Sequence, residues 1–267
     1  MSRDFNEWMP LALEGKTALV CGSSQGIGFA AANHLAALGA RVILMARNKE
    51  RLLQALEHLP ESHRHDLVVA DFSQPALVEQ AVQQLVSREP VHILINNTGG
   101  PAGGPITDAD ANAFRDAFEQ HLICNHILAQ AVLPGMKEAG YGRIINVIST
   151  SVKQPLANLG VSNTIRGAVA SWAKTWANEV GVHGVTVNNV LPGATDTARL
   201  DQIISNKSSK TGADPEDIRN EMASAVPLKR TGKPEEVARA IAFLASPSAS
   251  YISGINLPVD GGRTSSL

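Results

Sequence analysis

The stretch Gly22-Ser-Ser-Gln-Gly26-Ile-Gly28 directly follows the apolar run Thr17-Ala-Leu-Val-Cys21 and opens an amphipathic segment, 26–38. The apolar run predicts a buried strand, and the segment after it predicts a helix. Glycines between a strand and a helix permit a tight turn and let a phosphate approach backbone N–H groups, which the helix N-terminus makes partly positive. The stretch therefore predicts a phosphate-binding turn formed by Gly22, Ser24, Gln25, Gly26, Ile27 and Gly28.

Apolar runs alternate with longer amphipathic segments along the rest of the chain. We expect strands at 17–21, 41–46, 67–71, 92–96, 143–148, 185–191 and 255–259. We expect helices at 26–38, 75–87, 114–137, 160–180 and 234–245. Most of the runs are continuously apolar, as strands buried on both faces must be. The pattern predicts the α/β class: a doubly wound (Rossmann) parallel sheet of about seven strands with helices on both faces.

Size and composition favour one enzyme-sized domain. The chain has 267 residues, 44% apolar and 18% charged, with no linker or internal repeat. We therefore expect a single dinucleotide-binding domain over 1–267, with an N-terminal extension at 1–12. The net charge of -2 favours neither nucleic acid nor an anionic membrane, so a small-molecule substrate is the expected partner.

The two cysteines and the lack of targeting segments bear on location. Cys21 and Cys124 both lie in apolar stretches and predict buried thiols in a reducing compartment. Residues 1–10 do not resemble a secretory signal, and no apolar run is long enough to span a bilayer. We therefore expect a cytoplasmic protein.

The polar stretch 205–214 interrupts the alternation of strands and helices before the last expected helix. Its small polar residues predict a flexible connection. An insertion at the carboxyl edge of a parallel sheet fits a substrate lid, which would extend over 198–226. A solvated loop without a role is the alternative.

The end of the second expected strand bears on which dinucleotide binds. An acid at this place would bind the ribose 2′-hydroxyl of NAD(H) and repel a 2′-phosphate. Here Ala46 provides no acid, and Arg47 provides a planar cation that suits a phosphate. We therefore expect NADP(H), with NAD(H) as the alternative if Arg47 is only a surface charge.

These features resemble the short-chain dehydrogenase/reductase superfamily, and the resemblance extends over about 13–262. It implies that Asp71 contacts adenine and that Asn97 and Gly99 belong to the family's Asn-Asn-Ala-Gly segment. It also implies that a Pro-Gly turn and the threonine segment after it hold the nicotinamide and the diphosphate. The residues of this turn and segment are Pro192, Gly193, Thr195 and Thr197. The resemblance also implies a homodimer or homotetramer, and a 3-oxoacyl-carrier-protein reductase-like activity.

The resemblance weakens at the catalytic positions, so we expect an atypical active site. The family uses Asn, Ser, Tyr and Lys; the phenol donates a proton, and the lysine binds the nicotinamide ribose. Aligned on Arg166-Gly-Ala-Val, the Lys position holds Arg166 and the Tyr position holds Ser162. The Asn position falls on His121, and Ser149 alone agrees. Arg166 can keep the ribose hydrogen bonds, but it stays charged.

The missing phenol leaves the source of the proton open. Tyr141 and Tyr251 are the two tyrosines of the sequence, and neither has the spacing of the family's acid. Ser162 is a poor proton donor because an alcohol ionises far less readily than a phenol. His121 would titrate in the right range if it faces the cavity, and Lys153 could act with a lowered pKa. The alternatives are a packed or exposed histidine and a solvated lysine.

Three functions remain open at this point. The first is an NADP(H)-dependent oxidoreductase that interconverts a carbonyl and a secondary alcohol through Ser149, Arg166 and either His121 or Lys153. The second is a nucleotide-binding module, a sensor or partner subunit, without reductase chemistry. The third is a non-redox reaction, such as an elimination, on the same scaffold.

Two further motifs carry weaker signals. The pair His63 and His65 has no nearby acid or thiol cluster, so no metal site is expected. Trp172 and Trp176 lie one helical turn apart, and we expect them to face a helix partner or a subunit interface.

Overall fold

The structure, a computed structural model, describes residues 11–60 and 64–266. A parallel sheet of seven strands lies at its centre, in the order β3-β2-β1-β4-β5-β6-β7. The strands are β1 (Thr17–Cys21), β2 (Arg41–Ala46), β3 (Asp66–Val69), β4 (Ile93–Asn96), β5 (Gly142–Val147), β6 (Val185–Pro192) and β7 (Asn256–Val259). The predicted Rossmann fold is confirmed, and the strand order reverses between β1 and β4, where such sheets bind ligands.

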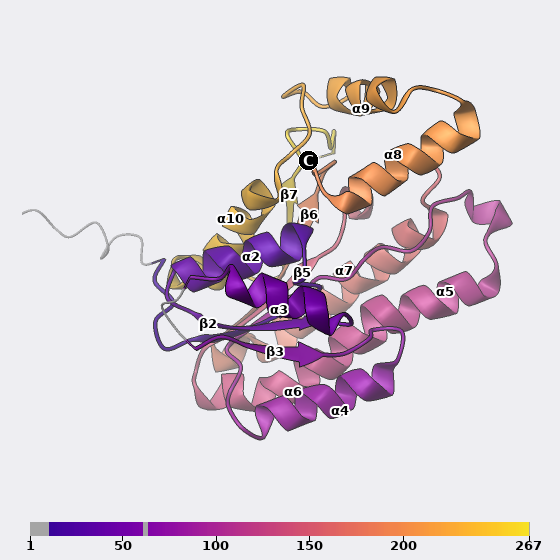
Figure 1. The fold of residues 1–267 in the computed structure, drawn as a ribbon. Coiled ribbons are helices and arrows are strands. Elements are labelled where there is room, and N and C mark those ends of the chain that lie inside the picture. The colour runs from indigo at the N-terminus through magenta and orange to yellow at the C-terminus, as the bar shows by residue number, and fades with distance from the viewer. Residues whose placement is uncertain (1–10, 61–63, 267) are drawn as a thin grey trace, which may run out of the picture.

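Helices cover both faces of the sheet (Figure 1). The first face carries α2 (Gly26–Ala37), α3 (Lys49–Glu57) and α10 (Pro234–Ala245). The second carries α4 (Pro75–Val86), α6 (Cys124–Glu138) and α7 (Gly160–Val180). Side chains of β1 alternate between the two cores, with Ala18 and Val20 in one and Leu19 and Cys21 in the other. This double burial explains why the strands are continuously apolar.

The helix expected at 114–137 is interrupted. It consists of α5 (Ala111–Phe118), a π-helical turn (Glu119–Ile123) and α6. A π-helical turn inserts an extra residue into the helical register, and such turns are frequent at functional sites. Here it contains His121, one of the candidate catalytic residues, whose exposed fraction is 1%.

The polar stretch 205–214 is not the flexible connection that the sequence predicts. Helix α8 (Ala198–Thr211) runs through most of it and ends at Gly212, in the left-handed conformation, before α9 (Pro215–Ser224). Serine and lysine are tolerated on the exposed side of a helix, so sequence pattern alone missed it. A small apolar cluster joins the two helices through Leu200, Ile204 and Ile218. In Figure 1, α8 and α9 (orange) lie together beyond one end of the sheet.

A row of four asparagines, three buried and one half-buried, crosses the carboxyl half of the sheet. Asn96 donates to Asn146 at 2.8 Å, Asn146 donates to Asn189 at 2.9 Å, and Asn189 donates to Asn256 at 2.8 Å. These residues are register partners on β4, β5, β6 and β7. A slip of one residue in any of these four strands would break at least one of the three bonds, so the row fixes the register of the strands that carry the site.

The predicted buried thiols are confirmed. Cys21 and Cys124 are buried and free, and burial raises the pKa of both thiols. Within the described residues, no helix has the length and apolar character needed to cross a bilayer.

Candidate active site

The glycine turn after β1 is closely packed against backbone. Gly22 and Gly26 have φ of 59° and 58°, the left-handed region that favours glycine. A Cβ added to Gly28 would lie 2.3 Å from the carbonyl oxygen of Gly22 and 2.7 Å from Nδ2 of Asn97. These positions therefore require glycine, in agreement with the sequence prediction for the turn.

Two side chains hold this turn in place. Asn97, directly after β4, donates from Nδ2 to the carbonyl oxygens of Cys21 and Gly22, both at 3.3 Å. Ser23 is fully buried, and its hydroxyl accepts a hydrogen bond of 2.9 Å from the backbone N–H of Met45. Sequence reasoning missed Ser23, because a serine between glycines gives no signal that distinguishes a structural hydroxyl from a solvated one.

The turn fits the diphosphate of a dinucleotide. Gln25 precedes α2 and makes no side-chain cap, so the first N–H groups of the helix have no side-chain acceptor there. The segment after β6 also approaches the turn, because a Cβ added to Gly26 would lie 3.3 Å from Cγ2 of Thr197. The structure thus brings the two expected diphosphate segments together.

Backbone packing and local bonds order the segment between β6 and α8. A Cβ added to Gly193 would lie 2.8 Å from Cα of Asp260. Thr195 donates to the carbonyl oxygen of Gly193, and Thr197 caps α8 by accepting from the N–H of Leu200. Pro192 ends β6. A Cβ added to Gly99, on the loop after β4, would meet nothing within 4 Å.

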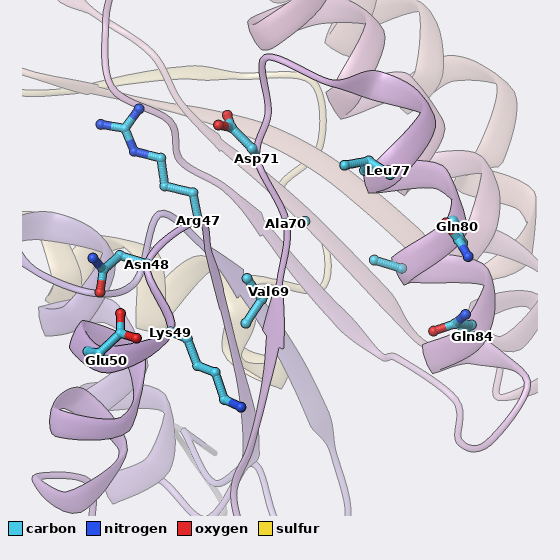
Figure 2. Close-up of a pocket in the computed structure, with 11 residues that line it drawn as sticks. Arg47, Asn48, Lys49, Glu50, Val69, Ala70, Asp71, Leu77, Gln80 and Gln84 are labelled. Atoms are coloured by element: carbon cyan, nitrogen blue, oxygen red, sulfur yellow. The ribbon is translucent and has the colours of Figure 1, made fainter.

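A pocket of about 760 Å³ lies beside the ends of β2 and β3. Arg47 and Asp71 both line it, and Figure 2 shows their side chains at the same end of the pocket. Lys49 points the other way in that view. Val69 and Leu77 are exposed here and provide apolar surface, as an adenine ring would require. Arg47 itself is exposed, so solvent can reach the cation that the sequence analysis assigned to a 2′-phosphate.

Arg166 is buried at the carboxyl edge of the sheet, although it carries a guanidinium. It lies on α7 and is 6% exposed. Its Nη1 donates to the carbonyl oxygen of Val147 at 3.2 Å, and its Nη2 donates to that of Thr98 at 3.4 Å. Burial, and secondly the charge of Arg199, lower the pKa of Arg166 to about 10, so it remains charged at neutral pH.

His121 lies beside this arginine but does not titrate near neutrality. Its Nδ1 shares a hydrogen bond of 2.6 Å with the hydroxyl of Thr98. Burial, and then the positive charge of Arg166, lower its pKa to about 2. His121 therefore fits the alternative of a packed histidine, because its side chain is buried and lies next to a cation. Its Nε2 has no protein partner among the described residues.

The remaining candidates lie on two elements. Ser149 follows β5, and its hydroxyl accepts a hydrogen bond of 3.1 Å from the N–H of Ser151. Lys153 is half-buried on the same loop. Ser162 lies on α7 one turn before Arg166 and is half-buried. The role of each in catalysis stays a prediction.

Neither tyrosine replaces the missing phenol. Tyr141 donates to the carbonyl oxygen of Ala245 at 2.5 Å, and its ring lies between Lys16 and Arg143. It directly precedes β5, at the opposite end of that strand from Ser149. Tyr251 is fully exposed. Both observations agree with the sequence analysis.

The two weaker motifs have structural explanations. Trp172 and Trp176 lie against His126 of α6, with ring centroids 6.3 and 5.8 Å from it, which confirms a helix partner. His65 accepts a hydrogen bond from the N–H of Val42, and His63 lies outside the described residues. No group of three or more metal-ligating side chains occurs in the part of the chain that the structure describes.

Comparison with known proteins agrees with this geometry. The family model described as Enoyl-(Acyl carrier protein) reductase matches residues 22–264. The chain is 36% identical over 254 residues to the 3-oxoacyl-(acyl-carrier-protein) reductase FabG of Vibrio cholerae, covering 94% of this chain and 98% of that protein. It is 30% identical over 258 residues to the NADPH-dependent reductase BacG of Bacillus subtilis, covering 94% and 99%.

A solved structure is similar over nearly the whole chain. L-sorbose reductase from Gluconobacter frateurii, complexed with NADPH and L-sorbose, superimposes with a TM-score of 0.90 at 32% identity, covering 97% of this chain and 100% of that one. The fold and the glycine turn define a dinucleotide-binding protein of the Rossmann type. The chain belongs to the short-chain dehydrogenase/reductase superfamily.

Proposed function

We propose that this protein is an NADP(H)-dependent oxidoreductase that interconverts a carbonyl and a secondary alcohol. The observation that carries the proposal is the glycine cradle at Gly22 and Gly28, which lies at the same sheet edge as Arg166 and the segment that leads to Ser149. The relatives that are named NADPH-dependent reductases support the cofactor and the reaction class. Arg47 supports NADP(H) over NAD(H), since a guanidinium suits a 2′-phosphate.

The positions of Arg166 and Ser149 each support a role in binding the cofactor or the substrate. The nicotinamide cofactor, when bound, supplies or accepts the hydride. Arg166 is fixed by two backbone carbonyls and would donate its other N–H groups to the nicotinamide ribose. Ser149 accepts a bond from Ser151, and its own O–H would donate to the substrate oxygen.

The proton is assigned by elimination between the two titratable candidates. His121 stays neutral and packed, so it cannot serve as a cationic acid near pH 7. We propose Lys153, half-buried on the loop after β5, as the proton donor in its place. Ser162 would hold the substrate oxygen by a hydrogen bond without titrating.

The test is NADPH oxidation, followed as loss of reduced-nicotinamide absorbance with a panel of ketones and oxo acids. We expect turnover that Ser149→Ala lowers by about 100-fold in kcat, as removal of an oxyanion donor does. Ser151→Ala is the matched control, because its buried hydroxyl has no partner among the described residues. It should change kcat by less than about threefold, since the backbone N–H that meets Ser149 is kept.

A nucleotide-binding module is the second candidate, favoured by the missing phenol and the neutral His121. Saturable NADPH binding without turnover on the whole panel would establish it and refute the reductase. Equal activity of Ser149→Ala and Ser151→Ala would instead remove Ser149 from the mechanism.

The assembly and location are proposed on weaker support. We propose a cytoplasmic homodimer or homotetramer that contains one dinucleotide-binding domain over 1–267, with 1–12 as an extension. Two buried free thiols support a reducing compartment. We also propose that 198–226 acts as the substrate lid, supported by the position of α8 and α9 beyond the sheet (Figure 1).

A further inference from the structure

Two arginines from different elements converge beside Gly100, on the loop after β4. Arg166 comes from α7, and Arg199 comes from the first turn of α8. A Cβ added to Gly100 would lie 3.9 Å from Nη2 of Arg166 and 3.8 Å from Nη2 of Arg199. Both guanidinium groups therefore reach the same point, one from the body of the protein and one from the proposed lid.

The bonds that hold these two groups are to neutral acceptors. Arg166 donates to the carbonyl oxygens of Val147 and Thr98, and Arg199 donates to that of Pro101 at 2.7 Å. These bonds orient the guanidinium groups but leave their positive charges uncompensated. Each group has five N–H donors, so donors remain for a ligand.

Neither arginine of this pair has a carboxylate counter-charge among the described residues. By contrast, Arg219 on α9 pairs with Asp196 and Asp201. Arg166 is also deeply buried, and a buried charge without a partner is costly. The charge of Arg199 adds to this cost and lowers the pKa of Arg166. A bound anion would relieve both effects.

The position of the pair separates it from the diphosphate cradle. The cradle is formed by the turn at Gly22 and Gly28, against Asn97. The arginine pair adjoins Thr98 and Val147, at the edge from which Ser149 extends. An anion here would lie beside the reacting carbonyl and beneath the first turn of α8.

We propose that Arg199 binds a carboxylate of the substrate beside the buried charge of Arg166, so that this enzyme acts on oxo acids and their hydroxy acids. The proposal rests on the reductase function proposed above and names its substrate class. A planar guanidinium pairs with a carboxylate through two parallel N–H···O bonds, which makes the pair selective for this group. Arg199 then acts as a specificity residue that the lid brings to the substrate.

The test compares oxo acids with their methyl esters, which keep the carbonyl and lose the charge. The panel is pyruvate, 2-oxobutyrate, acetoacetate and 4-oxopentanoate, each with its ester. In Arg199→Gln, we expect kcat/KM for the acids to fall by about tenfold or more and that for the esters to fall far less, since a charge-assisted bond is lost only with the acids. Arg199→Lys should recover part of the loss, which a misfolded variant would not.

The matched control is Lys210→Gln, which removes an exposed positive charge from the other end of α8. It should leave the ratio of acid to ester activity unchanged. An equal loss for acids and esters in Arg199→Gln would overturn the proposal. If NADPH affinity falls by the same factor, the anion that Arg199 binds is the cofactor diphosphate instead.

A binding measurement keeps this proposal apart from the reductase function. Acetoacetate and methyl acetoacetate are titrated by calorimetry into the protein saturated with NADP⁺, where no turnover is needed. We expect acetoacetate alone to bind, and Arg199→Gln to weaken it. If no carbonyl is reduced but this result holds, the reductase proposal fails and the carboxylate site stands. If acetoacetate binds no better than its ester, the carboxylate site fails.

Discussion

The two halves of the site, the diphosphate cradle and the edge that carries Ser149 and Arg166, depend on different features of the sequence. The diphosphate cradle depends on the absence of side chains at Gly22 and Gly28 and on backbone N–H groups at the start of α2. The proposed catalytic edge, where Ser149 and Arg166 lie, depends on the chemistry of side chains, and there the sequence predicts that Ser149 alone matches the family's four residue types. A cradle made of backbone allows almost no replacement, whereas a catalytic edge can change its residues while the fold beneath it persists.

The two halves also differ in electrostatics. Arg47, at the cradle's outer end, is exposed, and solvent screens its charge. Arg166 and His121 are buried together, so the charge of the first directly opposes protonation of the second. Substitutions in the cradle should therefore change cofactor binding, whereas substitutions at the buried edge should change turnover and pH dependence.

The largest effect is expected from Gly28→Ala. Alanine is favoured over glycine inside a helix by about 1 kcal/mol, so propensity alone would favour the change. The added Cβ would nevertheless lie 2.3 Å from the Gly22 carbonyl oxygen, which must move and open the cradle. We expect NADPH affinity, measured by fluorescence titration, to fall by more than about 100-fold.

Gly181→Ala is the matched control for this substitution. A Cβ at Gly181 meets nothing within 4 Å, so NADPH affinity should stay at the wild-type value. Circular dichroism and the urea midpoint would show whether Gly28→Ala remains folded. A folded Gly28→Ala protein with wild-type affinity would show that the cradle is not where the diphosphate binds.

A smaller effect is expected from Arg47→Asp, at the exposed end of the cradle. The substitution removes a phosphate ligand and adds an acid that can bind a ribose 2′-hydroxyl. The ratio of NADPH to NADH affinity should fall by about tenfold to 100-fold, measured by titration with both nucleotides. Lys49→Gln is the control, because Figure 2 shows Lys49 directed away from Arg47 and Asp71. An unchanged ratio would refute the assignment of Arg47 to the 2′-phosphate.

The sequence predicted the cradle well because its signals are local. Strand, glycine turn and helix follow one another, and the spacing of Gly22, Gly26 and Gly28 fixes the backbone geometry. The sheet was predictable for a similar reason, since strands buried on both faces must be apolar throughout. Element ends shifted by a few residues, and α3, capped by Asn48, lies between the second and third strands, where the alternation of strands and helices implies a helix.

The catalytic edge was less predictable because its geometry is not local. The alignment placed His121 and Arg166 in the same site, but it gave no sign of the π-helical turn that packs His121 against Thr98. Nor could it show Arg199 meeting Arg166, since the two lie on separate elements that meet only in the fold. The asparagine row is similar: four scattered residues become one structure once strand register is known.

The smallest effect concerns His121 beside the buried Arg166, and it is measured as the pH dependence of the free energy of unfolding. In the folded protein, burial and Arg166 lower the pKa of His121 from 6.5 to about 2, while the unfolded chain keeps the ordinary value. Below about pH 6.5, His121 is protonated in the unfolded chain but stays neutral in the folded protein. The free energy of unfolding therefore falls as pH falls, by at most about 1.4 kcal/mol per pH unit. In His121→Asn the free energy of unfolding should no longer carry the part of this pH dependence that His121 contributes. The measurement is urea unfolding at a series of pH values between about 7.5 and about 5. The exposed His183→Asn should keep this pH dependence. If His121→Asn and wild type instead lose stability in parallel, His121 takes up its proton in the folded state, and it would return as a candidate acid for the reaction in place of Lys153.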